Sequence, residues 1–324
     1  MNDLPAQAKA AASQRWDAID VARGVAILAM IVYHFAWDLS FLNLIETNII
    51  QVPAWRWFAR AIAGSFLFLA GFGLALAHAE GFRRLSFLKR LLKVGGAAAI
   101  ITLVTLFAFP QSYIFFGILH AIAVSSVLAL PFLRLHPSVV LGAAVICVAA
   151  PLVFTSPALD APWLDWLGLG AADPVTNDYV PIFPWFGLVL AGLAAGLWHL
   201  PHRQTMRLAR WRAKDSLGRG LIWAGRESLP IYLIHQPVLL AVLYGVLQIA
   251  GPNPVAEARP FMLQCEATCL QNAQPATCRS VCSCAVDNLR QSDLWRKILD
   301  NSIAAEDRTR ISRVAQQCLR NAPP

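Results

Sequence analysis

About seven apolar runs constrain the fold of this chain more than any other feature. Each is roughly 17–25 residues long, the length that a helix needs to cross the hydrocarbon core of a bilayer. The chain as a whole is 57% hydrophobic and 14% charged, far from the composition of soluble domains. The runs lie near residues 21–44, 61–79, 91–109, 113–133, 138–154, 181–198 and 229–250. We predict an all-α, polytopic membrane helix bundle with a small cysteine-rich helical C-terminal tail.

Basic and acidic residues divide the loops between the two sides of the membrane. Residues 80–93 and 199–226 carry most of the Lys and Arg of the bundle, so the positive-inside rule places both segments in the cytoplasm. Residues 155–180 hold four Asp and no Lys or Arg, so we place them outside. The net charge of +8 is explained by this orientation, which argues against nucleic-acid binding.

An odd number of spans with the N-terminus inside puts the C-terminus outside. We predict a cytoplasmic N-terminal tail (1–17), a transmembrane acyltransferase-like domain (18–251) and a periplasmic disulfide-rich tail (252–324). The protein is then a multi-pass protein of the inner, plasma membrane. Residues 1–17 lack the apolar core and cleavage site of a signal peptide, so we expect no segment to be removed.

Six of the seven cysteines lie in the C-terminal tail. Two Cys-x3-Cys pairs each occupy one helix face, and residues 274–275 between them signal a turn, so two short antiparallel helices fit this spacing. The predicted disulfides are Cys265–Cys282, Cys269–Cys278 and Cys284–Cys318. Six cysteines allow fifteen pairings, so other connectivities stay open. A metal site is the alternative, but the tail has no His and no C-x2-C pair, so no metal is expected.

The first apolar run carries ionisable residues that a membrane helix holds only at a cost. Placing such a group near the bilayer centre costs about 2.5–3.5 kcal/mol, so a function is the default explanation. His34 and Asp38 are four residues apart and share a helix face. A carboxylate can orient an imidazole and raise its basicity, so we predict catalytic roles for both. Asp20 and Arg23 lie at the inner end, where an intrahelical ion pair gives them a structural role.

Two further histidines fall inside predicted spans and complete the predicted catalytic set. At about 1.5 Å per helical residue, His120 lies at a depth similar to that of His34, near the outer face. His235 lies about 9 Å from the inner face, in a different layer. Either one can instead be an interhelical hydrogen-bonding group. Residues 177–185 approach the outer mouth, where Asp178 and Trp185 are the predicted acceptor-binding residues.

Four sequence blocks together carry a resemblance to a known family. They are RWDAIDVARGVAI with YHFAWDL in residues 15–39, FGILH in 116–120, DYVPIFPW in 178–185 and GRESLPIYLIHQP in 225–237. With them the chain resembles the catalytic-domain family of heparan-α-glucosaminide N-acetyltransferase, a branch of the transmembrane acyltransferases. The resemblance covers roughly residues 15–250. His34 matches the position in the first helix that holds His or Asn in such proteins, and His235 matches the histidine of the late helix.

The resemblance implies an integral membrane enzyme that takes acetyl from cytosolic acetyl-CoA and delivers it to an amino sugar on the far side. The lysosomal enzyme has more spans and a luminal N-terminal domain, whereas this chain carries a cysteine-rich tail. The expected acceptor is therefore a cell-envelope glycan, or another amine or hydroxyl. Acetyl-CoA is expected as the co-substrate.

The sequence suggests how the parts would act together. Basic residues at the cytoplasmic mouth bind the CoA phosphates, since guanidinium groups pair well with phosphate. The acetyl group passes His235 and reaches His34, which deprotonates the acceptor or carries the acetyl group itself. Asp178, Trp185 or Asp38 holds the acceptor. The predicted CoA-binding residues are Arg84, Arg90, Arg212 and Arg226.

Two other classes of function fit the same pattern. A transporter or flippase of a polar or glycan substrate also buries charged residues along its route. A scaffold would use the bundle to display the tail to an envelope partner. CoA binding distinguishes the enzyme from the transporter, and lost turnover in a folded His34→Ala variant distinguishes it from the scaffold. The expected partners are acetyl-CoA, the acceptor and the bilayer; a homo-oligomer stays open.

Overall fold

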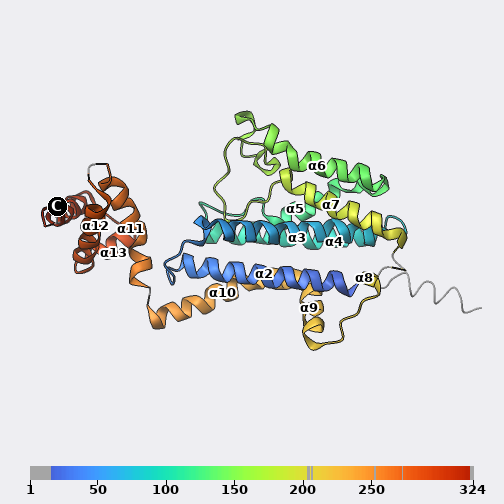
Figure 1. Ribbon diagram of the computed structural model, residues 1–324, viewed down its shortest axis with the longest axis horizontal. Coiled ribbons are helices and arrows are strands. Elements are labelled where there is room, and N and C mark those ends of the chain that lie inside the picture. The colour runs from blue at the N-terminus through green and yellow to red at the C-terminus, as the bar shows by residue number, and fades with distance from the viewer. Residues whose placement is uncertain (1–15, 203–204, 206, 252, 272, 322–324) are drawn as a thin grey trace, which may run out of the picture. The chain divides into compact units, whose positions relative to one another are not determined.

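The computed structural model describes residues 16–202, 205, 207–251, 253–271 and 273–321, which form helices and no strand (Figure 1). The chain divides into two compact units. The first comprises Ile50–Leu239 and the described residues up to Phe35. The second comprises Ala36–Ile49 and the described residues from Leu240 onward. The predicted domain boundaries at residues 17 and 251 stay a prediction.

The described residues contain five helices long and apolar enough to cross a membrane. They are α2 (Asp17–Phe41), α3 (Pro53–Ala77), α4 (Arg84–Ala108), α7 (Ile182–His199) and α10 (Ser228–Ala250). Two shorter apolar helices are α5 (Ile118–Leu128) and α6 (Pro137–Val153). The seven helices correspond to the seven predicted apolar runs, so the predicted all-α membrane bundle is confirmed.

Helix α7 lies at the centre of the first unit, where it packs along α3 and α6 (Figure 1). Glycines permit the close approach of α3 and α7. A Cβ on Gly71 would overlap the carbonyl of Val189, and one on Gly192 would overlap the carbonyl of Phe68. Small residues at such crossings are the usual means by which membrane helices gain packing contacts. These glycines therefore allow α3 to pack directly against α7.

A short helix, α9 (Ser216–Arg226), runs across α2 instead of along it (Figure 1). The crossing is as close as that of α3 and α7: the backbone of Gly225 lies on the carbonyl of Asp20, and that of Gly24 on the carbonyl of Leu221. Helix α10 starts at Ser228, directly after this crossing. The crossing therefore determines the point along α2 at which α10 begins.

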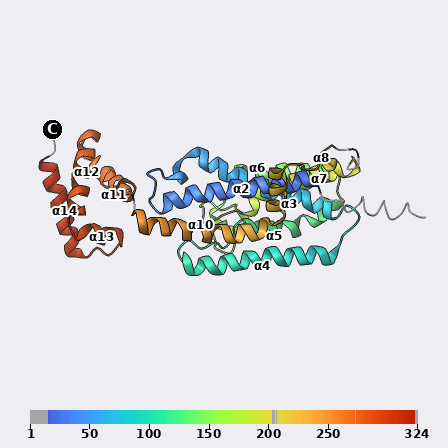
Figure 2. The same ribbon diagram turned by 90° about the horizontal axis from the view of Figure 1, so that it is seen from below.

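The tail in the second unit folds into α11 (Pro254–Cys269), α12 (Pro275–Arg290), α13 (Leu294–Leu299) and α14 (Ala305–Arg320). Helix α12 packs against the other three, and Figure 2 shows the four helices as one group. The structure confirms the three predicted disulfides, Cys265–Cys282, Cys269–Cys278 and Cys284–Cys318. The first two disulfides can form side by side because cysteines four residues apart share a helix face.

Candidate active site

A cavity of about 910 Å³ opens at one end of the first unit. Its walls come from the start of α2, the end of α3, the first half of α4, the start of α5, and the region where α9 meets α10. Because the basic segments around residues 80–93 and 207–226 gather here, we call this the basic end of the bundle. The volume suits a ligand larger than a simple sugar.

The cavity lining carries a surplus of positive charge. Six cationic side chains face two carboxylates, a surplus of four. The cations are Arg23, Arg83, Arg90, Lys93, Arg210 and Arg226, and the carboxylates are Asp20 and Glu80. Low-dielectric walls focus the field of such a cluster. The cavity is therefore suited to a ligand that carries several negative charges.

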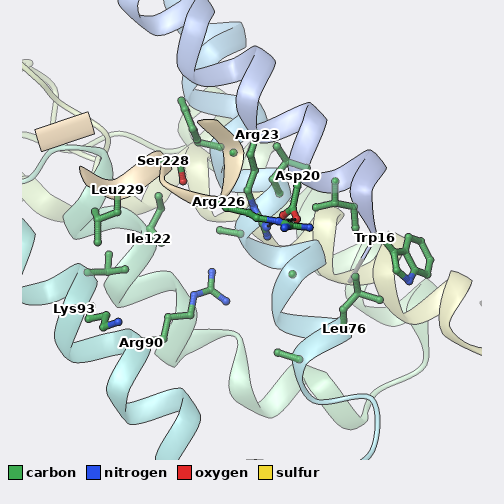
Figure 3. Close-up of a pocket in the computed structure, with 18 of the residues that line it drawn as sticks. Trp16, Asp20, Arg23, Leu76, Arg90, Lys93, Ile122, Arg226, Ser228 and Leu229 are labelled. Carbon is green, nitrogen blue, oxygen red and sulfur yellow. Dashed lines mark hydrogen bonds and ion pairs between the residues drawn. The ribbon is translucent and has the colours of Figure 1, made fainter. Parts of the chain in front are cut away.

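Two walls of the cavity differ in how their cations are held, as Figure 3 shows. On one wall, the buried carboxylate of Asp20 pairs with Arg23 at 3.2 Å and with Arg226 at 3.0 Å. On the other wall, Arg90 and Lys93 project from α4. Neither of these two side chains forms a hydrogen bond or ion pair with another residue in the described part of the chain. They are available to an anionic ligand.

Away from the basic end, the lining of the cavity becomes apolar. Ile27, Phe66, Ile118 and Ile122 line this part, together with Tyr232. Two histidines follow on the same helices. His34 lies two helical turns beyond Ile27 on α2, and His235 lies one turn beyond Tyr232 on α10. The cavity therefore leads from a charged end toward the two imidazoles.

The rings of His34 and His235 are in contact, with centroids 4.9 Å apart and an edge-to-face arrangement. The prediction that His235 lies in a different layer is therefore wrong. That prediction assumed that α10 begins at the inner membrane surface. Instead the chain passes through α9, which crosses α2 at Gly24 and Gly225, so α10 begins deeper and carries His235 to the level of His34.

The hydrogen bonding of His235 defines its tautomer. Its Nδ1 lies 2.7 Å from the carbonyl oxygen of Tyr232, and a carbonyl oxygen can only accept, so Nδ1 carries the proton. The remaining nitrogen, Nε2, is then a hydrogen-bond acceptor. It is buried and has no partner among the described residues. A histidine whose one nitrogen is fixed by a carbonyl and whose other nitrogen is free has the arrangement of a general base.

The hydrogen bonds of His120 use both of its ring nitrogens. The backbone N–H of Gly117 donates to Nδ1 at 3.3 Å, so Nε2 carries the proton and donates to Oγ1 of Thr102 at 3.1 Å. The hydroxyl of Thr102 in turn donates to the carbonyl of Ile114 at 2.7 Å. This series of hydrogen bonds connects α4 to the segment before α5. The geometry favours a structural role for His120, and its predicted catalytic role stays a prediction.

Asp178 belongs to the segment before α7 and lies in space against the start of α5. Its Oδ2 accepts a hydrogen bond from the backbone N–H of Ile118 at 2.9 Å. Burial raises the pKa of this carboxyl to about 6, although the Ile118 hydrogen bond opposes the change. Asp178 is also within electrostatic range of Tyr33 and Tyr232, whose rings contact His34 and His235 respectively. Its charge therefore reaches the two tyrosines that contact the histidine pair.

The remaining predicted site residues divide into those that line the cavity and those that lie elsewhere. Arg90 and Arg226 line the cavity, but Arg84 and Arg212 are not among its lining residues. The guanidinium of Arg212 instead donates to the carbonyls of Ala209 and Trp211, at the end of α8 (Arg207–Arg210). Trp185 packs against the apolar core of the first unit. Asp38 is fully buried and belongs to the second unit, so its predicted pairing with His34 stays a prediction.

Sequence reasoning missed Arg83 and Lys93 as cavity residues, although their helical spacing from the predicted Arg90 would have identified them. Arg83, Arg90 and Lys93 recur at helical spacing on α4, on one face with Ser86, whereas Arg84 falls on another face. No signal in the sequence pointed to Tyr232, since its place depends on how α10 meets α2. The same holds for the contact of Asp20 with Arg226.

A metal site is not indicated by the structure. No group of three or more His, Cys, Asp or Glu side chains with metal-binding geometry occurs among the residues described. The observed polar groups are those of acid–base chemistry and anion binding.

Comparisons with known proteins bear directly on this cavity. Residues 15–237 match the family model described as "Heparan-alpha-glucosaminide N-acetyltransferase, catalytic", and this range covers both the cavity and the histidine pair. Comparison with curated proteins and with solved structures finds no match. More than half of the chain lies within the matched range. The chain belongs to the catalytic-domain family of heparan-alpha-glucosaminide N-acetyltransferase, a family of membrane acetyltransferases.

Proposed function

We propose that this protein transfers an acetyl group from cytosolic acetyl-CoA to an amine or hydroxyl of a glycan on the outer side of the inner membrane. One observation carries the proposal: a cationic cavity at the basic end leads, through an apolar section, toward the contacting His34 and His235. Membership of the acetyltransferase family supports the reaction type.

The chemistry of CoA matches the order of groups along the cavity. CoA carries its phosphates at one end and its thioester at the other, with a long uncharged arm between them. The phosphates fit the cationic end, where Arg90 and Lys93 have no acidic partner among the described residues and Arg226 presents a guanidinium. Arginine forms paired hydrogen bonds with phosphate oxygens. The arm would then lie against Ile27 and Ile118 and bring the thioester toward the imidazoles.

The histidine pair supplies the groups for direct acyl transfer. Nε2 of His235 takes the proton from the acceptor N–H or O–H, and the acceptor atom attacks the carbonyl carbon of the thioester. The carbon–sulfur bond then breaks, and the CoA sulfur leaves as a thiolate that takes up the proton. A positioned base of this kind accelerates transfer by about 10²–10⁴-fold. The ring of His34 contacts that of His235, and we assign to His34 the role of holding the acceptor and the thioester together.

The direction of transfer follows from the distribution of charge. The positive-inside rule places the basic end in the cytoplasm, where acetyl-CoA is made available. The acceptor then approaches from the opposite side, on which we place Asp178, whose charge reaches Tyr33 beside His34. A carboxylate at this position is suited to hold the hydroxyls or the amine of a sugar. The N-terminus of α2 is cytoplasmic in this arrangement.

The test uses purified protein in sealed liposomes, with labelled acetyl-CoA outside or inside and glucosamine or extracted envelope glycans in the other compartment. We expect label to reach the acceptor with the wild type and to be reduced at least about 100-fold in His34→Ala and His235→Asn. His136→Asn is the control, because His136 caps α6 outside the cavity and Asn fills the same role. Acceptor transport without acetylation would favour a transporter and contradict the proposal.

A further inference from the structure

We propose that Asp20 is a positioning residue of the cavity: its carboxylate holds the guanidinium groups of Arg23 and Arg226 in the orientation that binds a phosphate group. The inference rests on the proposed function, because it takes the phosphate to be that of CoA. It also assigns a new role to Asp20, which the sequence explained as a purely structural partner of Arg23.

The geometry around Asp20 is that of a shared carboxylate. Only 4% of the residue is exposed. Oδ1 accepts a hydrogen bond from Nη1 of Arg23 at 3.2 Å, and Oδ2 accepts one from Nε of Arg226 at 3.0 Å. Each carboxylate oxygen therefore fixes one guanidinium. Both arginines line the cavity, and their side chains remain 29% and 41% exposed, so their outer edges are accessible to a ligand.

The backbone fixes the same point independently of the side chains. Arg226 is the last residue of α9, and the preceding Gly225 lies directly on the carbonyl of Asp20. The two partners are 206 residues apart in sequence, so this contact is a product of the fold. A surface ion pair would contribute little and would not need such close backbone contact. Arg226 has five N–H donors; Nε donates to Asp20, and Nη2 lies 3.6 Å from Oδ1 of Asp17.

The surroundings explain why the arginines need to be held. Arg90 on the opposite wall is close enough to Arg23 for the two positive charges to repel each other. Asp20 pairs with Arg23 and Arg226 against this repulsion, and Asp17 is a second, more distant partner of Arg226 at 3.6 Å. The Asp20 carboxylate keeps them at the wall, so that a phosphate can bridge the two sides of the cavity. Pre-organised cations lose less conformational entropy when the ligand binds.

The proposal predicts a sign opposite to that of simple charge accounting. The substitution Asp20→Asn removes a negative charge from a cationic cavity, so a purely electrostatic view predicts tighter binding of acetyl-CoA. If Asp20 positions the guanidiniums, the same substitution weakens binding. Charged hydrogen bonds that lose their alignment account for a rise in Kd of about 10- to 100-fold.

The experiment measures Kd for acetyl-CoA by calorimetry with the full chain in detergent, together with turnover of acetyl-pantetheine, which lacks the phosphates. For Asp20→Asn we expect the weaker binding of acetyl-CoA with unchanged turnover of acetyl-pantetheine. Arg226→Lys keeps the charge but loses the planar fork, and we expect it to weaken binding similarly. The control is Glu227→Gln, which removes an exposed carboxylate next to Arg226 and should leave Kd at or below the wild-type value.

The outcomes separate the inference from the proposed function. If Asp20→Asn binds acetyl-CoA as tightly as the wild type, or more tightly, the positioning role is refuted while the proposed function stands. If the wild type does not bind acetyl-CoA, both are refuted. If Asp20→Asn loses turnover of acetyl-pantetheine as well, its fold has failed, and Arg226→Lys then decides: unchanged Kd refutes the positioning role, and weakened Kd supports it.

Discussion

His235 and His120 differ in one structural respect, and this difference predicts opposite effects of substitution. His235 presents a buried Nε2 with no partner among the described residues, whereas both nitrogens of His120 are hydrogen-bonded. We consider His235→Asn and His120→Ala. The Asn amide can replace Nδ1 in donating to the carbonyl of Tyr232, and it removes only the free nitrogen.

The magnitudes follow from these contacts. Loss of a general base reduces turnover by about 10²–10⁴-fold, equivalent to about 3–5 kcal/mol in the activation barrier. Removing an unpaired buried acceptor relieves about 1–3 kcal/mol, which offsets the packing lost with the smaller side chain, so His235→Asn should unfold near the wild-type temperature. His120→Ala leaves the N–H of Gly117 without its partner and should lower the free energy of unfolding by about 1–3 kcal/mol.

The assay combines acetyl transfer in liposomes with thermal unfolding in detergent. His235→Asn should lose activity and keep its unfolding temperature, while His120→Ala should unfold several degrees earlier and keep its activity at low temperature. Activity of His235→Asn within about fivefold of the wild type would refute its role as the base. A loss of activity in His120→Ala without a change in unfolding temperature would refute the structural role and support the catalytic one.

Three further effects follow from the structure. Gly71→Val should destabilise the bundle by at least about 1–3 kcal/mol in thermal unfolding, because its side chain would overlap the backbone of α7, whereas Gly95→Ala, with open space around it, should not. Removing the Cys284–Cys318 disulfide, which is closed across 34 residues, should lower tail stability by about 3–4 kcal/mol when denaturation is followed by circular dichroism, and equal stability would contradict this. Burial raises the pKa of Asp178 above its ordinary value of 3.8 to about 6, so the folded state holds the proton more tightly and stability should fall as pH rises between these values; Asp178→Asn should abolish that part of the pH dependence.

The sequence was sufficient for features that depend on a single helix. The apolar runs predict the membrane helices because length and hydropathy are local properties. The cysteine spacing predicts Cys265–Cys282 and Cys269–Cys278 for the same reason: residues four apart share a face, and two such faces can meet in only a few ways. Cys284–Cys318 was predicted from the two cysteines that remained.

The candidate site depends on contacts between helices, which periodicity does not supply. The depth of His235 was predicted wrongly because no local signal showed that α9 crosses α2 before α10 begins. The meeting of Asp20 with Arg226 joins residues 206 apart for the same reason. Among the predicted arginines, Arg90 lines the cavity and Arg84 does not, since charge alone does not state which face of α4 turns inward.

The order of groups along the cavity constrains the kind of donor it can serve. Asp20 and His34 are 14 residues apart on α2, so the clamped arginines and the histidine pair are separated by about 21 Å along the helix. A phosphate cannot follow the acetyl group across the section lined by Ile27 and Ile118, because burying its charge among apolar side chains is too costly. A donor must therefore keep its charges at the basic end and reach the imidazoles with a long neutral arm, and this requirement is met by CoA but not by a compact acyl phosphate. Under the proposed function, this separation of charge from chemistry would let the acetyl group reach the far side while the nucleotide stays behind, since only the neutral end of the donor would enter the bundle.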